Sequence, residues 1–289
     1  MDFVLYDNVA QFYDDVFEVL LTHEAQNTLI LGNLVTGYKG EDKFGWRDPA
    51  NWVMTTVKQG EKVVLVGLMT PPFKITLYAL DNNVDKISIK CLVDGLNANG
   101  IPIPGVVTEK SLAEAFADEY CTPRDLTHKI TMSQRIYKLT NVNPEISKIG
   151  TLRLANQQDL SFLPFWVEGF HADAVQGSDV NVSEDIEKYN YHISQGKLYV
   201  LEVDGTPVSM TKVARETPNG VCVGLVYTPP YWRGKGYASG VVAQVSQVCL
   251  DKGFKLCTLY TDLTNPTSNN IYQKIGYKPV CDSLEITFE

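Results

Sequence analysis

The pattern of apolar and polar positions predicts two successive stretches of mixed helix and strand. In the first stretch, apolar residues at helical spacing begin near Val9, and the chain from there to Leu34 is predicted to form a long helix or a helix pair. The elements expected next are strands over 52–57, 62–69, 75–80 and 130–139 and helices over 86–97 and 108–120. The last helix has Thr108 as its N-cap, with Ser111 as an alternative start.

A polar segment with proline and glycine, 140–150, separates the two stretches and predicts two domains, 1–140 and 151–289. The second domain is expected to have strands over 151–155, 198–203, 207–215, 221–228, 256–261, 277–280 and 284–288, and helices over 159–170, 182–195, 237–252 and 267–275. The Asp204-Gly205 dipeptide predicts a hairpin turn. This mixture places the chain in the α/β (α+β) class.

Composition excludes several functions. With 289 residues, 44% hydrophobic and 20% charged, the chain is a globular protein with a core, and its net charge of −9 argues against nucleic acid as a partner. No apolar run approaches the roughly 20 residues of a membrane span, and the start lacks a signal-peptide pattern, so we expect a cytoplasmic protein without a membrane partner. The four histidines are scattered, which predicts no metal site.

The strongest local signal is the stretch from Val226 to Ala238, which joins an apolar run to the turn Arg-Gly-Lys-Gly and then to a helical pattern. Glycines let the backbone approach phosphate oxygens, and the free N–H groups at a helix start point at an anion. Arg233 and Lys235 add positive charge. The pattern predicts a pyrophosphate site.

A second segment, Asp262 to Tyr277, follows the next expected strand and contains Asn265, Ser268 and Tyr272. The chain lacks the Gly-x-x-x-x-Gly-Lys-Ser/Thr pattern of P-loops and the Gly-x-Gly-x-x-Gly pattern of dinucleotide folds. Ser268 and Tyr272 share one helix face by their spacing.

The element order together with Arg233-Gly-Lys-Gly-Tyr-Ala238 and the Asn265–Tyr272 segment resembles the GNAT superfamily of acyl-CoA-dependent N-acetyltransferases. The resemblance covers about 152–288. It implies a mixed, mostly antiparallel central sheet flanked by helices, with acetyl-CoA as the donor. The first 140 residues are expected to be a degenerate copy of this fold, a substrate lid or a dimerisation unit.

The resemblance also implies roles for particular residues. Tyr272 would be the acid toward the coenzyme A thiolate, as a phenol with a pKa of about 10 can be at neutral pH. A bulge near Gly224 would free backbone for the thioester. The residues expected to hold the cofactor are Val226, Thr228, Arg233, Gly234, Lys235, Gly236, Tyr237, Ala238, Asn265 and Ser268.

The general base stays open at this point. Strand 221–228 has no glutamate, which many family members use there, so Glu202, Asp262, His171 or a water chain are the alternatives. We expect direct acetyl transfer to the primary amine of a small molecule, amino acid or peptide, by a monomer or homodimer. The alternatives are a non-catalytic acyl-CoA sensor and a transferase with a longer acyl or aminoacyl donor.

One internal similarity bears on the first domain. The segment from Val66 to Phe73 resembles that from Val223 to Tyr231, because both run from an apolar strand into Thr-Pro-Pro and an aromatic residue. It is either a coincidence or the mark of a duplicated domain whose first copy has lost the phosphate site.

Overall fold

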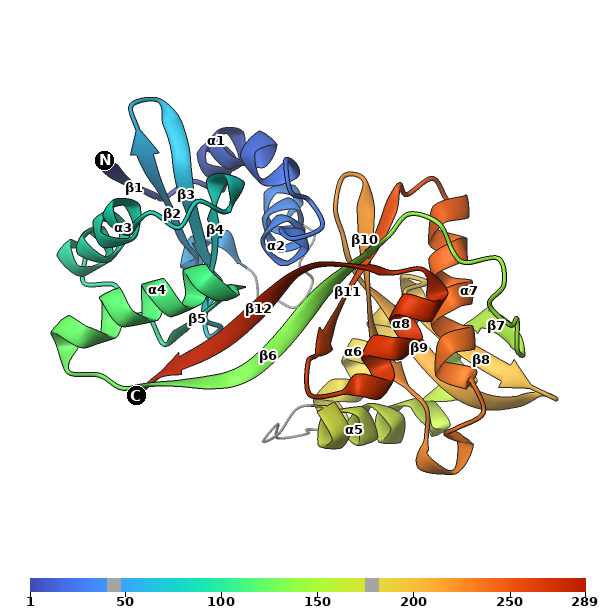
Figure 1. Cartoon of the computed structure of the whole chain (residues 1–289). Coiled ribbons are helices and arrows are strands. Elements are labelled where there is room, and N and C mark those ends of the chain that lie inside the picture. Colours follow the sequence, from blue (N-terminus) through green and yellow to red (C-terminus); the bar gives the residue numbers. More distant parts are fainter. Residues whose placement is uncertain (41–47, 175–181) are drawn as a thin grey trace. The chain divides into compact units, whose positions relative to one another are not determined.

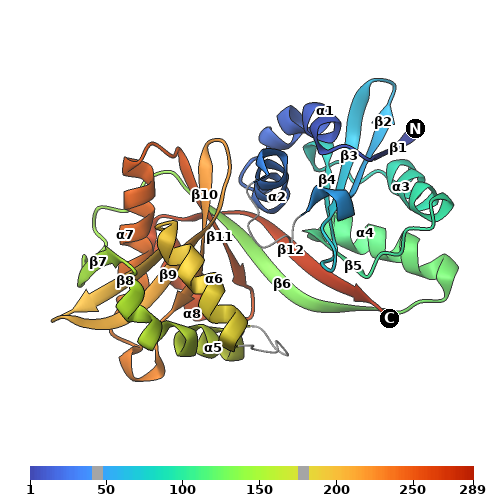
Figure 2. The same ribbon diagram turned by 180° about the vertical axis from the view of Figure 1, so that it is seen from behind.

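The computed structural model describes residues 1–40, 48–174 and 182–289 of the chain (Figures 1 and 2). The chain divides into two compact units. Unit 1 comprises Met1–Ile136 together with Val280–Glu289, and unit 2 comprises Tyr137–Pro279.

Unit 1 is a sheet with two helices on each face. Its strands follow the order β1-β2-β3-β4-β5-β12, and β12 is followed by the first part of β6. The elements are β1 (Asp2–Tyr6), α1 (Val9–Leu21), α2 (Thr28–Lys39), β2 (Val53–Gln59), β3 (Lys62–Met69), β4 (Ile75–Ala79), α3 (Lys86–Ala98), β5 (Gly105–Glu109), α4 (Lys110–Cys121), β6 (His128–Leu139) and β12 (Lys278–Phe288). The short 3-10 helices are η1 (Pro49–Asn51), η2 (Leu80–Asn82) and η3 (Thr122–Arg124).

Two cores hold unit 1 together, one on each face of the sheet. Phe12 of α1 and Leu31 of α2 are fully buried against one face. Leu92 of α3 and Phe116 of α4 are fully buried against the other. Each helix therefore buries an apolar stripe on the sheet, as the helical spacing predicts.

Unit 2 repeats this arrangement. Its strands follow the order β7-β8-β9-β10-β11-β6. The elements are β7 (Thr151–Leu154), η4 (Gln157–Ser161), α5 (Leu163–Ala174), α6 (Val182–Ser194), β8 (Leu198–Val203), β9 (Thr206–Glu216), β10 (Gly220–Tyr227), η5 (Pro230–Trp232), α7 (Tyr237–Asp251), β11 (Leu256–Asp262) and α8 (Pro266–Ile275). Helices α7 and α8 cover the face that is nearer in Figure 1, and Figure 2 brings α6 in front of the other face.

The two units have the same topology. Each runs strand, two helices, three antiparallel strands, helix, parallel strand, helix. The sixth position of each sheet is filled by a strand that follows the other unit's last helix, because β12 pairs with β5 and β6 lies next to β11. The expected mixed, mostly antiparallel sheet flanked by helices is confirmed, and unit 1 has that fold too.

Several expected elements differ in the structure. The predicted helix 108–120 begins later, because Thr108 belongs to β5, and Glu109 is the N-cap whose side chain accepts the Leu112 N–H. Strand β1 was not predicted. The two expected closing strands, 277–280 and 284–288, form the single strand β12, and Val9–Leu34 contains a helix pair.

The domain assignment 1–140 and 151–289 stays a prediction, but the structure departs from it at the end of the chain. Val280–Glu289 lies in unit 1 because Ser283–Thr287 pairs with Gly105–Glu109. Pairing between strands far apart in the sequence leaves no local signal, so the polar segment 140–150 could not reveal it.

The Thr-Pro-Pro similarity is a coincidence of sequence. The first copy lies on β3 and the turn before β4, whereas the second lies on β10 and η5. By topology the counterpart of β10 is β4, not β3. The counterpart of the Arg233–Gly236 loop is therefore Leu80–Asp85, between β4 and α3.

Candidate active site

In unit 2 the two central parallel strands pair only where they begin. The pairing of β10 with β11 joins Gly220–Cys222 to Leu256–Thr258. Within the described part of the chain, the later residues of the two strands do not pair with each other. Their carboxyl ends thus leave backbone groups available at the point from which α7 and α8 start, which is where ligands bind in sheets of this kind.

A β-bulge interrupts β10 at this end. Gly224 pairs with Lys212 and Tyr227 with Met210, so three steps on β10 oppose two on β9. Leu225 takes a left-handed conformation with φ of 51°. An extra residue in one strand leaves a backbone group without its ladder partner. The sequence placed a bulge here from Gly224 and the two prolines that follow.

The start of α7 is formed by glycines in conformations that other residues rarely adopt. Gly234 has φ of 76° and Gly236, the N-cap, has φ of 82°. Within the described residues, no side chain caps this helix. Its first N–H groups therefore face outward, toward any anion that binds beside Gly236.

The two cations of the loop behave differently. Arg233 donates from Nε to the Thr228 carbonyl oxygen at 2.9 Å and forms an ion pair with Asp173 of α5. The Lys235 ammonium lies 4.7 Å from the centre of the Trp232 ring. Both side chains are exposed, so the loop presents positive charge at the helix start.

The corresponding place in unit 1 has the opposite charge. The N-cap of α3 is Asp85, whose carboxylate accepts the N–H groups of Ile87 and Ser88 at 3.2 Å and 3.1 Å. The Asp85 carboxylate already accepts hydrogen bonds from the first N–H groups of α3, and its negative charge would repel a phosphate. The start of α3 therefore does not share the features from which the sequence predicts an anion site at the start of α7.

Helix α8 is fastened to the end of β11 by amide side chains. The Asn265 carbonyl oxygen Oδ1 caps the helix by accepting the Ser268 N–H at 3.0 Å. Asn269 donates from Nδ2 to the Asp262 and Asn265 carbonyl oxygens, and its Oδ1 accepts the Tyr137 hydroxyl at 3.0 Å. Sequence reasoning missed Tyr137 and Asn269, because their contact joins residues 132 positions apart.

Tyr272 is buried on this helix, between two other tyrosine rings. Its ring centre lies 6.4 Å from that of Tyr137 and 6.1 Å from that of Tyr277, and the residue is 8% exposed. Burial raises the pKa of Tyr272 to about 12, and a hydrogen bond with Ser268 opposes the shift. The phenol therefore keeps its proton throughout the neutral range.

This shift predicts a pH dependence of stability. Because the ordinary pKa is 10.0 and the folded-state pKa is about 12, the unfolded chain loses the Tyr272 proton first as pH rises. Stability is then lost between pH 10 and 12, by up to about 1.4 kcal/mol per pH unit. In urea unfolding from pH 9 to 11, Tyr272→Phe should lose less stability than the wild type. If the free energies of unfolding of the two proteins fell in parallel as pH rises, the raised pKa of Tyr272 would be contradicted.

Two of the candidates for the general base, Glu202 and Asp262, are hydrogen-bonded to neighbouring side chains or backbone. Glu202 accepts a hydrogen bond from Arg153 at 2.7 Å, and the same guanidinium is paired with the buried Asp159. Asp262 accepts both the N–H and the hydroxyl of Thr264 through Oδ1 at 2.7 Å. Both carboxylates are thus held by local partners. His171 lies half-buried on α5.

The predicted cofactor residues fall on three neighbouring stretches of unit 2. Val226 and Thr228 lie at the end of β10 and just beyond it; residues 233–238 form the loop and the first turn of α7; Asn265 and Ser268 begin α8. Their binding roles stay predictions, as does the catalytic role of Tyr272.

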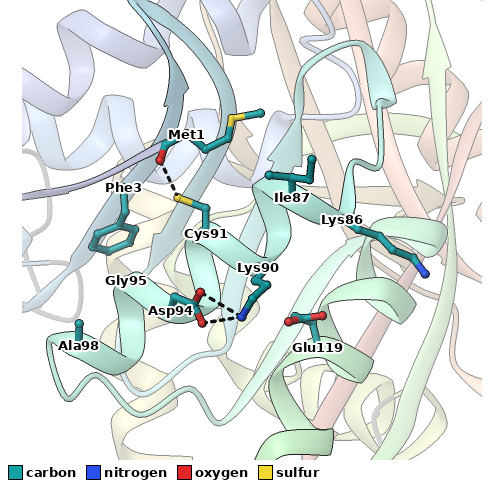
Figure 3. Close-up of a pocket in the computed structure, with 10 residues that line it drawn as sticks. All are labelled: Met1, Phe3, Lys86, Ile87, Lys90, Cys91, Asp94, Gly95, Ala98 and Glu119. Carbon is teal, nitrogen blue, oxygen red and sulfur yellow. Dashed lines mark hydrogen bonds and ion pairs between the residues drawn. The ribbon is translucent and has the colours of Figure 1, made fainter.

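A surface hollow of about 740 Å³ lies elsewhere, on unit 1 (Figure 3). Phe3 of β1 and Cys91 and Gly95 of α3 line it, and the Lys90–Asp94 ion pair lies on the same helix. It contains none of the predicted site residues. The hollow is therefore separate from the chemistry of unit 2.

Comparison with known proteins identifies the class to which this site belongs. Residues 165–277 match the model of the acetyltransferase (GNAT) family, the family that the motifs of this part of the chain resemble. The family transfers acyl groups from acyl coenzyme A. No curated protein matches the chain. Among the described residues, no helix has the length and apolar character needed to cross a membrane.

Solved structures show the same fold over the whole chain. A Drosophila protein has a TM-score of 0.67 at 10% identity, covering 99% of this chain and 98% of that one. A GCN5-related N-acetyltransferase from Sphaerobacter thermophilus has a TM-score of 0.63 at 13% identity, covering 99% and 95%. An acetyltransferase of the GNAT family from Colwellia psychrerythraea has a TM-score of 0.58 at 12% identity, covering 100% and 99%. The likeness extends over both units.

Proposed function

We propose that unit 2 transfers the acetyl group of acetyl-CoA to the primary amine of a small molecule, amino acid or peptide. Transfer is direct, within a complex that holds donor and acceptor together. The observation that carries the proposal is the glycine-capped start of α7, which the chain reaches through η5 from the bulged end of β10, where the described residues of β10 and β11 no longer pair.

The donor is held by backbone more than by side chains. The end of β10, at Val226 and Thr228, offers peptide groups to the pantetheine amides, as an added strand would. The amides of Gly234 to Ala238 and the ammonium of Lys235 meet the pyrophosphate. The left-handed conformations of Gly234 and Gly236 support this, since they turn successive N–H groups toward one side.

The chemistry follows from what lies beside this strand end. The acceptor nitrogen, once deprotonated, attacks the thioester carbonyl, and a β10 N–H stabilises the negative oxygen. The nitrogen then gives up its excess proton to solvent, and the C–S bond breaks as the amide forms. Tyr272 gives its hydroxyl proton, or a strong hydrogen bond, to the departing thiolate. Burial and the raised pKa of Tyr272 support the role of donor rather than base.

Within the described residues, we propose one such site, in unit 2. The Asp85 carboxylate that caps α3 in unit 1 favours this reading, because an acidic N-cap occupies the position of the phosphate. Soluble, cytoplasmic action on a small amine without a metal ion is part of the proposal.

A second candidate is a non-catalytic sensor of acyl-CoA. The absence of an acidic residue from Gly220–Tyr227 favours it, as does the engagement of Glu202 and Asp262 by other groups. A transferase with a longer acyl or aminoacyl donor is a third. Release of coenzyme A thiol in the presence of an amine panel would exclude the sensor, and a series of acyl chain lengths would identify the donor.

Titration calorimetry tests the donor. We expect acetyl-CoA to bind the purified protein with one site per chain and at least about tenfold more tightly than ATP or NAD, a difference of about 1.4 kcal/mol. Equal affinity for the three ligands would contradict the proposal. Two sites per chain would contradict the proposal that unit 1 does not bind acetyl-CoA.

A further inference from the structure

Arg233 is tied to the protein on two sides. Its Nε donates to the Thr228 carbonyl oxygen at 2.9 Å, which closes the loop between the end of β10 and Arg233 itself. Its Nη2 pairs with the Asp173 carboxylate on α5, and its guanidinium carbon lies 5.7 Å from the centre of the Tyr227 ring.

Helix α5 lies directly against the end of β10 at this point. A Cβ on Gly169 would lie 2.3 Å from the Tyr227 hydroxyl oxygen, so any larger residue would force this contact to shift. The rings of Trp166 and Tyr227 are 6.4 Å apart, and both residues are buried. The Arg233–Asp173 pair continues this contact outward, joining the loop before α7 to α5.

These contacts leave Arg233 poorly placed to bind a phosphate itself. A carboxylate beside a guanidinium offsets its charge, and a second anion would have to compete with Asp173 and with the Thr228 carbonyl. Lys235 has its ammonium on an aromatic ring instead of on a carboxylate.

We propose that Arg233 is a positioning residue, which holds the phosphate-binding loop in shape and fastens it to α5, while Lys235 and the α7 amides meet the pyrophosphate. This inference rests on the proposed function, because it concerns how the same coenzyme A site is built. It gives different roles to Arg233 and Lys235, which the sequence pattern alone did not distinguish.

Whether Asp173→Ala weakens or tightens the binding of coenzyme A distinguishes a positioning role of Arg233 from direct phosphate binding. If Arg233 positions the loop, Asp173→Ala removes its anchor and weakens coenzyme A binding. If Arg233 binds phosphate directly, Asp173→Ala removes a competitor and tightens binding. Glu168→Ala is the matched control, since it removes an exposed carboxylate from the same helix and reports the long-range effect of charge alone.

The experiment measures the Kd of coenzyme A by calorimetry at several salt concentrations. We expect Asp173→Ala to bind about two- to fivefold more weakly than Glu168→Ala, because the Arg233–Asp173 pair is half exposed. Arg233→Gln should weaken coenzyme A binding by a similar factor. The double variant, with Asp173→Ala and Arg233→Gln, should bind no more weakly than the single variant that binds coenzyme A less tightly. The salt dependence should fall in Lys235→Gln but not in Arg233→Gln.

Three results would overturn the inference. Binding by Asp173→Ala that equals or exceeds that of Glu168→Ala is the first, and a drop in salt dependence in Arg233→Gln as large as in Lys235→Gln is the second. The third is additive weakening in the double variant. A wild-type protein that binds no coenzyme A would instead overturn the proposed function itself.

Discussion

Tyr272→Phe is expected to lower kcat by about a hundredfold while leaving the Kd of acetyl-CoA within about twofold, the range typical of losing a general acid. The substitution removes one oxygen and keeps the buried ring between Tyr137 and Tyr277. The departing thiolate would then lack its proton donor. Steady-state kinetics with an amine acceptor, combined with calorimetry of acetyl-CoA, measures the two effects separately.

Tyr277 supplies the matched control. It is also buried, its pKa is also raised by burial, and its hydroxyl lies 2.8 Å from the Ser246 hydroxyl, within the core. Tyr277→Phe should therefore reduce stability by about 1 kcal/mol and leave kcat nearly unchanged. An unchanged kcat in Tyr272→Phe, or an equal loss in both variants, would remove Tyr272 from the mechanism.

Gly236→Val is expected to weaken acetyl-CoA binding by about a hundredfold or more, equivalent to about 2.7 kcal/mol. Gly236 has φ of 82°, which a β-branched residue rarely adopts, and its Cβ would lie 3.1 Å from the Ile149 side chain. To relieve the backbone strain and the contact with Ile149, the first turn of α7 must shift. Its N–H groups would then no longer point at the pyrophosphate. Calorimetry on the folded variant measures the loss.

Gly253 lies just beyond the other end of α7 and has φ of 99°, with no atom within 4 Å of an added Cβ. Gly253→Val therefore carries a comparable backbone strain without touching the site. Both variants should have a lower Tm than the wild type, and only Gly236→Val should lose the ligand. Wild-type affinity in Gly236→Val would show that α7 does not hold the pyrophosphate.

Local sequence was enough to predict the parts of the site that lie on continuous stretches of chain. The glycines at positions 234 and 236 predicted a turn that opens a helix, and the spacing of apolar residues predicted a short helix over 267–275; the structure has α7 after this turn and α8 over Pro266–Ile275. Hydrophobic periodicity found the long helices for the same reason, since the information lies within one or two turns.

Contacts between distant residues could not be predicted in this way. The partner of Arg233 is 60 positions away, and the residue that holds Asn269 is 132 positions away. Strand β5 was not predicted, and its last residues, Thr108 and Glu109, were taken for the start of a helix because the strand is short and leads directly into α4. Its identity as a strand comes from pairing with β4 and β12, which no local pattern encodes.

The strand β12 has a consequence for the biosynthesis of this protein. A ribosome makes the chain from the N-terminus, yet β5 receives its partner from Ser283–Thr287, with Ser283 bonded to Thr108 across 175 positions. Until these residues emerge, the edge of β5 is an open template for any extended segment nearby. Unit 1, although synthesised first, can complete its sheet only after unit 2 has been synthesised. A nascent chain arrested before residue 280 should therefore be the form that aggregates and recruits chaperones.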